Sequence, residues 1–314
     1  MITYDSQRTI DASGAFLIGE LERLDPEINL PLVGTTYTRD IQFREDVNIA
    51  DEISSFTKTG FGVAGTGANP KGKNWVSQES TALAGINVDI DKKGFPLTLW
   101  GMELGWTVIE LAAAQQMGRP IDTQKYDGMV LKWHMDADEQ VYIGDTDLGV
   151  KGLANYTGVA VGNATKSWLT STVAEIRDSI NKVLSDAWAA SGYTVVPQDL
   201  LLPPEQYAYI AQVIVSDAGN QSLLTYLTTN TISFHQNGIP LNIRAVKWLK
   251  GAGVAGTNRM VAYTNDRKYV RFPLVPLTSI PIQYRGLWQL VTYYGKLGVV
   301  EAPYIETLAY FDGI

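Results

Sequence analysis

The residues best suited by type and spacing to carry out chemistry are the glycines of Gly251–Gly256 (GAGVAG), which match the dinucleotide-binding fingerprint. That fingerprint requires a following helix, whose N-terminus receives the pyrophosphate, and an acid about 20 residues further on for the ribose. Here the next segment, 257–263, has the pattern of a short strand, and no Asp or Glu occurs between Arg267 and Val300. We therefore interpret the glycines as a flexible connection and expect no cofactor.

Histidine chemistry would have to use His134 or His235, the two histidines of the chain. His134 and Asp138 are one helical turn apart and share a face, which would suit two metal ligands. A two-ligand pair is weak evidence for a metal, so we expect a structural role. His235 has no acid within the eight residues that follow it, and no serine lies in a Gly-x-Ser-x-Gly elbow. The sequence predicts neither a metal site nor a catalytic triad.

Paired carboxylates give no stronger signal for an enzyme. Glu103 and Glu110 share a predicted helical face but lie about 10 Å apart along its axis, at or beyond the separation of an inverting glycosidase pair. Asp145 and Asp147 form an Asp-x-Asp motif between glycines, where aspartates are typical turn formers. We expect no catalytic residues and no enzymatic activity.

Composition excludes several classes of protein. The 314 residues contain no cysteine, so disulfides and cysteine-ligated metals are absent. No apolar run approaches the roughly 18 residues of a membrane span, and we expect no membrane contact. The net charge of −8 argues against a general nucleic-acid-binding surface. Between Arg244 and Arg271, however, seven basic residues accompany a single acid, Asp266. This basic segment is either a solvated face or a contact with an acidic neighbour or packaged nucleic acid.

Hydrophobic periodicity predicts the elements that would position these residues. Apolar residues at three- to four-residue spacing predict helices over Leu99–Gly118 and from Asp122 to Val141. A third begins with the capping box Thr172–Glu175 and ends at Gly192. Shorter helices are expected at 14–24, 204–213 and 221–230. Strands are expected at 241–249, 259–264, 268–275, 282–293 and 299–308. Helices early and strands late indicate an α+β architecture.

An extended hairpin is predicted near the N-terminus. Alternation at Tyr37, Arg39, Ile41 and Phe43 indicates one strand, and alternation over 86–90 indicates a second. Between them lies a polar, glycine-rich stretch. A lone hairpin is marginal in water, so this one must lie on something else.

The order of these parts resembles the major capsid proteins of tailed bacteriophages, which have the Hong Kong 97 fold. Five stretches carry the resemblance: Glu103–Glu110, the turn within Ile143–Asn155 (Gly-Asp followed by Gly-x-x-Gly-Leu-x-Asn), Asp199–Tyr207, Gly251–Tyr263 and Glu301–Ile314. No short motif is diagnostic alone; their order and spacing carry the likeness. It covers the whole chain and is strongest from about residue 99 onward.

The resemblance implies a capsid fold with four parts. Residues 1–45 would form an N-terminal arm and 46–95 an extended loop that lies on a neighbouring subunit. Residues 96–214 and 271–314 would form a peripheral domain, with the helix from Leu99 to Gly118 as its spine. Residues 215–270 would form an axial domain. Pentamers and hexamers would build an icosahedral phage head around double-stranded DNA, assembled in the host bacterial cytoplasm. A portal protein, and candidate scaffolding and decoration proteins, would be partners.

Contacts between subunits are predicted at two places. The first is the extended loop, with Gly60, Gly62, Gly65, Gly67, Lys71 and Lys73. The second is the basic segment, with Arg244, Lys247 and Arg259.

Two other functions compete with this interpretation. An encapsulin-like compartment resembles the same fold but would enclose protein cargo. A carbohydrate-acting β-rich enzyme is suggested by 8 Trp and 16 Tyr. Aromatics at helical spacing are, however, more often part of a core.

Overall fold

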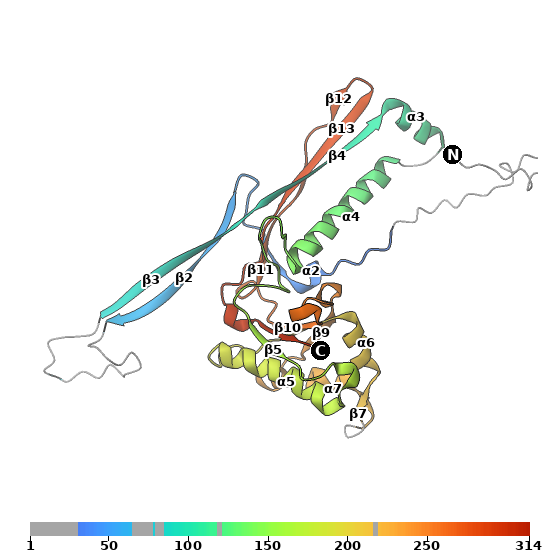
Figure 1. Cartoon of the computed structure of the whole chain (residues 1–314). Helices are drawn as coiled ribbons and strands as arrows, with labels where there is room; N and C mark the ends of the chain where they lie inside the picture. The colour runs from blue at the N-terminus through green and yellow to red at the C-terminus, as the bar shows by residue number, and fades with distance from the viewer. Residues whose placement is uncertain (1–30, 65–77, 79–84, 118–120, 216–218) are drawn as a thin grey trace, which may run out of the picture. The chain divides into compact units, whose positions relative to one another are not determined.

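Two five-stranded sheets organise the computed structural model, which describes residues 31–64, 78, 85–117, 121–215 and 219–314. Thr35–Ile314 forms one compact unit that contains all of the described elements (Figure 1). No helix among the described residues is long and apolar enough to cross a membrane.

The first sheet has the order β1-β11-β13-β12, and β4 also pairs with β13. Its strands are β1 (Gln42–Arg44), β4 (Thr98–Thr107), β11 (Arg271–Ser279), β12 (Gln283–Arg285) and β13 (Trp288–Leu297). β4 and β13 are antiparallel over their whole length, from Thr98 opposite Leu297 to Thr107 opposite Trp288. This long ladder is the frame on which the neighbouring helices lie.

Helix α4 (Ile121–Tyr142) packs against this frame. Its Met129 shares a buried cluster with Leu104 and Trp106 of β4. One helical turn further on, the ring of Trp133 meets that of Trp100 edge-on at 5.1 Å. Aromatic pairs of this kind stabilise by about 0.5–1.5 kcal/mol beyond the burial of their area.

The predicted helix over Leu99–Gly118 is wrong in its first half. Residues 98–107 form β4, and helix α3 begins only at Val108 and ends at Met117. Along β4 the side chains alternate, with Trp100, Met102, Leu104 and Trp106 turned toward the core. Leu99, Met102 and Trp106 are also three or four residues apart, so the local pattern fits a helix as well, and the partner strand β13 lies too far along the sequence for that pattern to reveal it. The long helix of this region is therefore α4.

The second sheet has the order β5-β14-β10-β6-β9. Its strands are β5 (Ala160–Asn163), β6 (Asp199–Leu202), β9 (Asn242–Ala245), β10 (Arg259–Tyr263) and β14 (Ala309–Asp312). The helices of this region are α5 (Val173–Ala190), α6 (Pro204–Gln212), α7 (Leu223–Thr229) and α8 (Ile232–Asn237). Figure 1 shows α5, α6 and α7 beside the second sheet.

The second sheet is buried on both faces. Met260 and Ala262 of β10 lie in a core with residues of α5, α6 and α7, while Val261 and Tyr263 lie in a core that includes Val141 of α4. Since side chains alternate along a strand, each face of the sheet belongs to a different core. This explains why Leu200–Leu202 of β6 and Met260–Tyr263 of β10 are continuous apolar runs.

The predicted helices in the second half of the chain are confirmed. α5 begins with the expected capping box, in which Thr172 Oγ1 accepts from the Glu175 backbone and Glu175 accepts from the Thr172 backbone. Gly192 after the helix has φ +66°, the left-handed conformation typical of that position. The predicted helices at 204–213 and 221–230 match α6 and α7, while the expectation at 14–24 lies outside the described residues.

One predicted strand is wrong in its first part, although its end forms β1 (Gln42–Arg44), and a second predicted strand is wrong. Tyr37–Asp40 forms the short helix α2, because Asp138 of α4 accepts hydrogen bonds from the backbone N–H groups of Thr36 and Tyr37. Residues 299–308 contain a single bridge at Glu301 and a short 3-10 turn, and the strand itself is β14. In both segments the backbone conformation depends on contacts with residues that are distant in the sequence.

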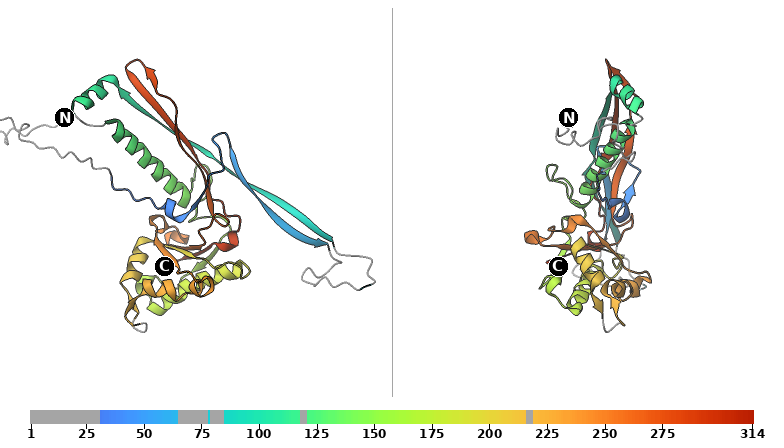
Figure 2. Two further views of the ribbon diagram at one scale, coloured as in Figure 1. Left: turned by 180° about the vertical axis from the view of Figure 1, so that it is seen from behind. Right: turned by 90° about the vertical axis from the view of Figure 1, so that its right-hand side faces the viewer.

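The extended hairpin exists, with its first strand later than predicted. β2 (Ile53–Ala64) pairs with β3 (Gly85–Pro96) through all twelve residues. Gly60 and Gly62 lie within β2 instead of in the tip, and Gly65, Gly67, Lys71 and Lys73 lie outside the described residues. β3 runs on almost directly into β4 (Figures 1 and 2).

The expected division into domains differs from the buried cores. Leu223 and Met260, from the proposed axial segment 215–270, share a core with Ile176, Ile210 and Phe311. The last three come from segments assigned to the peripheral domain. The core that holds these residues of 215–270 therefore also includes parts of 160–215 and the C-terminal strand, and the assignment of axial and peripheral domains stays a prediction.

Candidate functional site

Cations of the basic segment form ion pairs with carboxylates of the same chain. Arg244 Nη1 lies 3.1 Å from Asp40 Oδ1, and its Nη2 lies 3.7 Å from Asp199 Oδ1. Lys247 Nζ lies 3.4 Å from Asp138 Oδ2 and over the ring of Trp248. Asp40 and Asp138 are fully buried. The mutual repulsion expected of these cations is thus offset inside the chain, and their contact with a neighbour or a genome stays a prediction.

Arg259 is the most enclosed of the predicted contact residues. Its Nε and Nη2 each lie 2.7 Å from a carboxylate oxygen of Asp312, which is opposite it in the β10–β14 ladder. Its Nη1 donates to the carbonyl of Ala154 at 2.8 Å, and the guanidinium stacks over Tyr310. The hydrogen bond to Asp312 raises the pKa of Arg259 above its ordinary value. Only 7% of Arg259 is exposed, so its charge is balanced inside the chain, and its contact with a neighbour stays a prediction.

The glycine fingerprint and the histidine pair have structural roles. Gly251–Gly256 ends in a short 3-10 turn and leads into β10, so the helix that a dinucleotide needs does not follow. His134 Nδ1 lies 2.7 Å from Tyr37 Oη. The carboxylate of Asp138 accepts hydrogen bonds from the backbone N–H of Tyr37 in α2 and from Trp248 Nε1. Burial raises the pKa of Tyr37 to about 12. No group of three metal-ligating side chains occurs among the described residues.

The root of the hairpin is held by a buried carboxylate that the sequence did not reveal. Glu301 is fully buried, and its Oε2 accepts from Arg271 Nε of β11 at 2.7 Å. Arg44 Nη1 of β1 lies 3.3 Å from the same oxygen. Ser54 of β2 donates a short hydrogen bond to the other oxygen. Glu301 therefore joins the hairpin to two strands of the first sheet.

Apolar packing adds to this attachment. Phe56 of β2 and Phe95 of β3 stack with ring centroids 6.0 Å apart, and the Arg271 guanidinium lies over Phe56. Lys296 Nζ of β13 donates to the carbonyl of Asp51 at 2.7 Å. The hairpin is thus fixed at its root.

One face of the hairpin is bare from the root outward. Ile53, Val88 and Ile90 are 64%, 55% and 64% exposed. They share a face, because residues opposite in an antiparallel pair and two apart along a strand point the same way. We call this the outer face of the hairpin: Ile53, Thr57, Thr59, Val88, Ile90 and Lys92. It carries no carboxylate.

A second bare apolar area lies where α3 meets the end of the first sheet. The backbone N–H of Val108 donates to the carbonyl of Leu287 at 3.0 Å, which brings the start of α3 beside the β12–β13 turn. Ile109, Leu287 and Trp288 are all exposed there. Large apolar side chains gathered at one place on a surface mark an interaction site.

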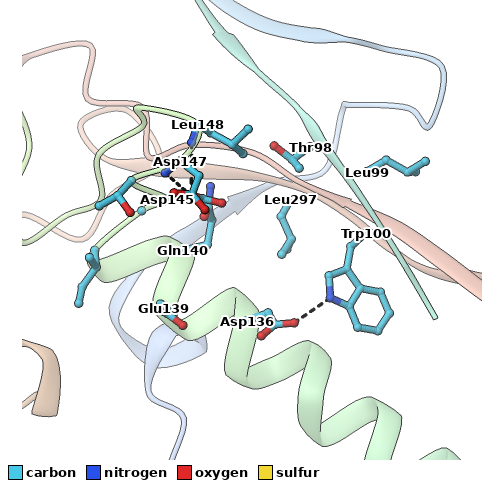
Figure 3. Close-up of a pocket in the computed structure, with 13 residues that line it drawn as sticks. Thr98, Leu99, Trp100, Asp136, Glu139, Gln140, Asp145, Asp147, Leu148 and Leu297 are labelled. Carbon is cyan, nitrogen blue, oxygen red and sulfur yellow. Dashed lines mark hydrogen bonds between the residues drawn. The ribbon is translucent and has the colours of Figure 1, made fainter.

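A hollow of about 420 Å³ lies between the start of β4, the end of α4 and the turn that follows α4 (Figure 3). Leu99, Trp100 and Leu148 supply apolar wall, and Glu139 and Asp147 supply acid. Asp136 is engaged by Trp100 Nε1 at 2.9 Å and by Lys132 at 2.5 Å. No lining residue is basic.

Comparisons with known proteins identify the fold. The capsid of Myoviridae phage XM1 is 20% identical in sequence, with a TM-score of 0.79, over 96% of this chain and 100% of that one. Mycobacterium phage Bobi gives 10% identity and a TM-score of 0.60 over 94% and 96%. An encapsulin complex of Synechococcus elongatus gives 11% and 0.54 over 95% and 94%. The chain thus has the Hong Kong 97-like capsid fold, with mixed helix and strand as predicted.

The sequence places the chain within this class. A family described as major capsid protein matches residues 72–314, more than half of the chain. The chain belongs to the major capsid protein family and is therefore a structural subunit of a capsid. A search of curated proteins found no match.

Proposed function

We propose that copies of this chain assemble, as pentamers and hexamers, into an icosahedral head that encloses double-stranded DNA. The observation that carries the proposal is the hairpin. At the root of its twelve-residue ladder Ser54 and Phe56 are buried on one face, while Ile53, Val88 and Ile90 on the other face are exposed. An isolated two-stranded hairpin is marginal in water, so a neighbouring subunit is needed to cover it. Obligate interfaces of this kind bury on the order of 2,000–5,000 Å².

The division of the subunit into parts is also a proposal. The second sheet and its helices would form the axial domain, and the first sheet with α4 the peripheral domain. The hairpin would lie on a neighbour, with Gly60, Gly62, Gly65, Gly67, Lys71 and Lys73 near that contact. Arg244 and Lys247, whose side chains are 23% and 47% exposed, keep a partly open side for a neighbour or the genome.

The proposed partners are further copies of the chain, a portal protein, and packaged DNA bound without sequence specificity. Scaffolding and decoration proteins are candidates. Assembly would take place in the host bacterial cytoplasm, without a membrane and without catalysis. A carbohydrate-acting enzyme is not favoured, because Trp106, Trp133 and Trp168 are buried in cores.

Electron cryomicroscopy of the purified protein and of particles from infected cells tests the proposal. We expect closed shells built from pentamers and hexamers. The double-stranded DNA inside them should be protected from nuclease. Shells that hold a defined protein cargo and no DNA would establish the encapsulin-like alternative. Protein that stays a monodisperse, compact monomer at micromolar concentration would refute both.

A further inference from the structure

The long strand formed by β3 and β4 changes its pairing partner at Leu97. The backbone N–H of Leu97 donates to the carbonyl of Glu52 at 2.9 Å, which closes the β2–β3 ladder. From Thr98 onward the strand pairs with β13, and the N–H of Val108 donates to the carbonyl of Leu287. In an antiparallel ladder, alternate residues direct both backbone groups toward the same neighbour. The odd-numbered residues of β4 therefore direct theirs away from β13, along the edge that β2 has left.

Three residues of this edge have no backbone hydrogen-bond partner within the described part of the chain. They are Leu99, Gly101 and Glu103, and all three are exposed. The edge is covered again just beyond them, because Lys125 Nζ donates to the carbonyl of Gly105 at 3.0 Å. A row of free N–H and C=O groups on an edge strand is a template for the addition of a further strand.

The surroundings of this open edge are acidic. The hollow described above is lined by Leu99 and Trp100 of β4, so it adjoins the start of the edge (Figure 3). Glu139 and Asp147 on its wall are exposed, and Glu103 lies on the edge itself. Within the described residues, none of these three carboxylates makes an ion pair. Since no Lys or Arg lines the hollow, a segment with positive charge is the complementary partner.

We propose that the open edge of β4 is a strand-addition site for an extended basic segment of a partner protein. In this mode of recognition, backbone hydrogen bonds supply affinity and pockets for alternate side chains supply specificity. Side chains of the added strand that point toward α4 reach the hollow, where a Lys or Arg lies against Glu139. The chain itself has a net charge of −8, so electrostatics favour a basic protein over a second copy. The inference goes beyond the proposed function, because the binding needs neither a shell nor DNA.

A basic strand-forming peptide tests the site on the full chain. The probe is a fluorescent acetyl-Lys-Val-Lys-Val-Lys-Val-Lys amide, and anisotropy measures its binding to the purified protein. The same peptide with Glu in place of Lys should not bind, because like charges oppose association. The N-methylated Lys peptide keeps its charge but lacks backbone N–H donors, so it should bind at least about tenfold more weakly. Equal binding of the two Lys peptides would show adhesion by charge alone and would overturn the proposal.

A proline at the centre of the edge tests the backbone contact from the side of the protein. Gly101→Pro removes an N–H that points away from β13, and proline is tolerated at such edge positions. A Cβ at Gly101 would lie 3.6 Å from its nearest neighbour, so there is room for it. Gly101→Ala keeps the N–H and is the matched control. We expect the Pro variant to bind the Lys peptide at least about tenfold more weakly, and the Ala variant to bind within about twofold of the parent chain.

Charge reversal gives a readout that leaves the backbone unchanged. Glu103→Lys and Glu139→Lys should each weaken binding of the Lys peptide by about threefold. Asp186→Lys, which makes the same charge change at an exposed position of α5, should bind like the parent chain. Thermal unfolding shows that each variant is folded.

The outcomes separate this site from the capsid function. If Gly101→Pro binds as tightly as Gly101→Ala, or if Glu139→Lys and Asp186→Lys behave alike, the strand-addition site is wrong and the capsid function stands. If Gly101→Pro, but not Gly101→Ala, prevents the purified chain from assembling by itself, the edge is occupied by a second copy and the proposal fails. A parent chain that binds the Lys peptide but never forms shells would refute the proposed function alone.

Discussion

The hydroxyl of Ser54 donates a hydrogen bond to the carboxylate of Glu301, 247 residues further along the chain. This bond crosses from the hairpin to the loop after the first sheet. The same carboxylate holds Arg271 and Arg44, so three segments meet on one buried charge. Removal of that charge would leave two guanidinium groups without their main buried partner.

We expect Glu301→Gln to destabilise the fold by about 3 kcal/mol, since breaking a buried ion pair leaves an uncompensated charge. The root of the hairpin should also become sensitive to protease, because Ser54 loses a charged acceptor. Thermal unfolding and limited proteolysis measure the two effects. Lys166→Ala, which removes an exposed pair with Glu175, is the control and should cost less than about 1 kcal/mol. Equal behaviour of the two variants would show that Glu301 is not an anchor.

Arg259→Ala is expected to cost about 3–5 kcal/mol, because Asp312 would stay buried without its bidentate partner. Salt screens buried pairs weakly, so the loss should be nearly the same at low and high ionic strength. Lys250→Ala, which breaks an exposed pair with Glu205, should have a small effect that salt reduces further. Melting curves at two salt concentrations measure both losses of stability. A loss for Arg259→Ala that vanishes in high salt would contradict the buried geometry.

The free energy of unfolding should depend on pH in part through the protonation of Asp199. Burial raises the pKa of Asp199 above its ordinary value of 3.8. The folded chain then keeps a proton that the unfolded chain has already released, so stability falls as pH rises from 3.8 through the folded pKa. The free energy of unfolding of the parent chain, minus that of Asp199→Asn, should fall over this window and be flat above it. Urea titrations in steps of pH measure it, and a difference that grows with pH would reverse the assignment.

A hairpin shortened in register should separate folding from assembly. Lys58 lies opposite Asp91, so residues 59–90 can be replaced by Asn-Gly, a dipeptide that favours a tight two-residue turn. Ser54, Phe56 and Phe95 keep their contacts, so we expect a folded subunit with near-normal circular dichroism. Regular shells should be lost. Normal shells from this variant would show that the hairpin beyond Lys58 is dispensable.

Local signals made most helices of the fold predictable. The capping box at Thr172 and the glycine at 192 both act within a few residues, and α5 has the expected limits. The turn in 143–155 was singled out by its residue order, and the structure supplies the reason. A Cβ at Gly152 would lie 2.4 Å from the backbone of Tyr142, so that position requires glycine.

Features that depend on distant partners were not predictable. β4 resembled a helix because its partner β13 is nearly two hundred residues away. Arg259 looked like a surface cation because nothing local shows that Asp312 stands opposite it. The Glu301 junction combines four segments, of which none carries a motif. In each case the structure depends on contacts between residues that are far apart in the sequence.

The position of β14 has a consequence for biosynthesis. β14 lies between β5 and β10, so β5 has no partner in the second sheet until residues 309–312 have left the ribosome. Chains interrupted earlier would expose two unpaired strand edges, a ready target for proteases and chaperones. Translation therefore sets an order of events in which a subunit can enter a particle only after its last strand has been made.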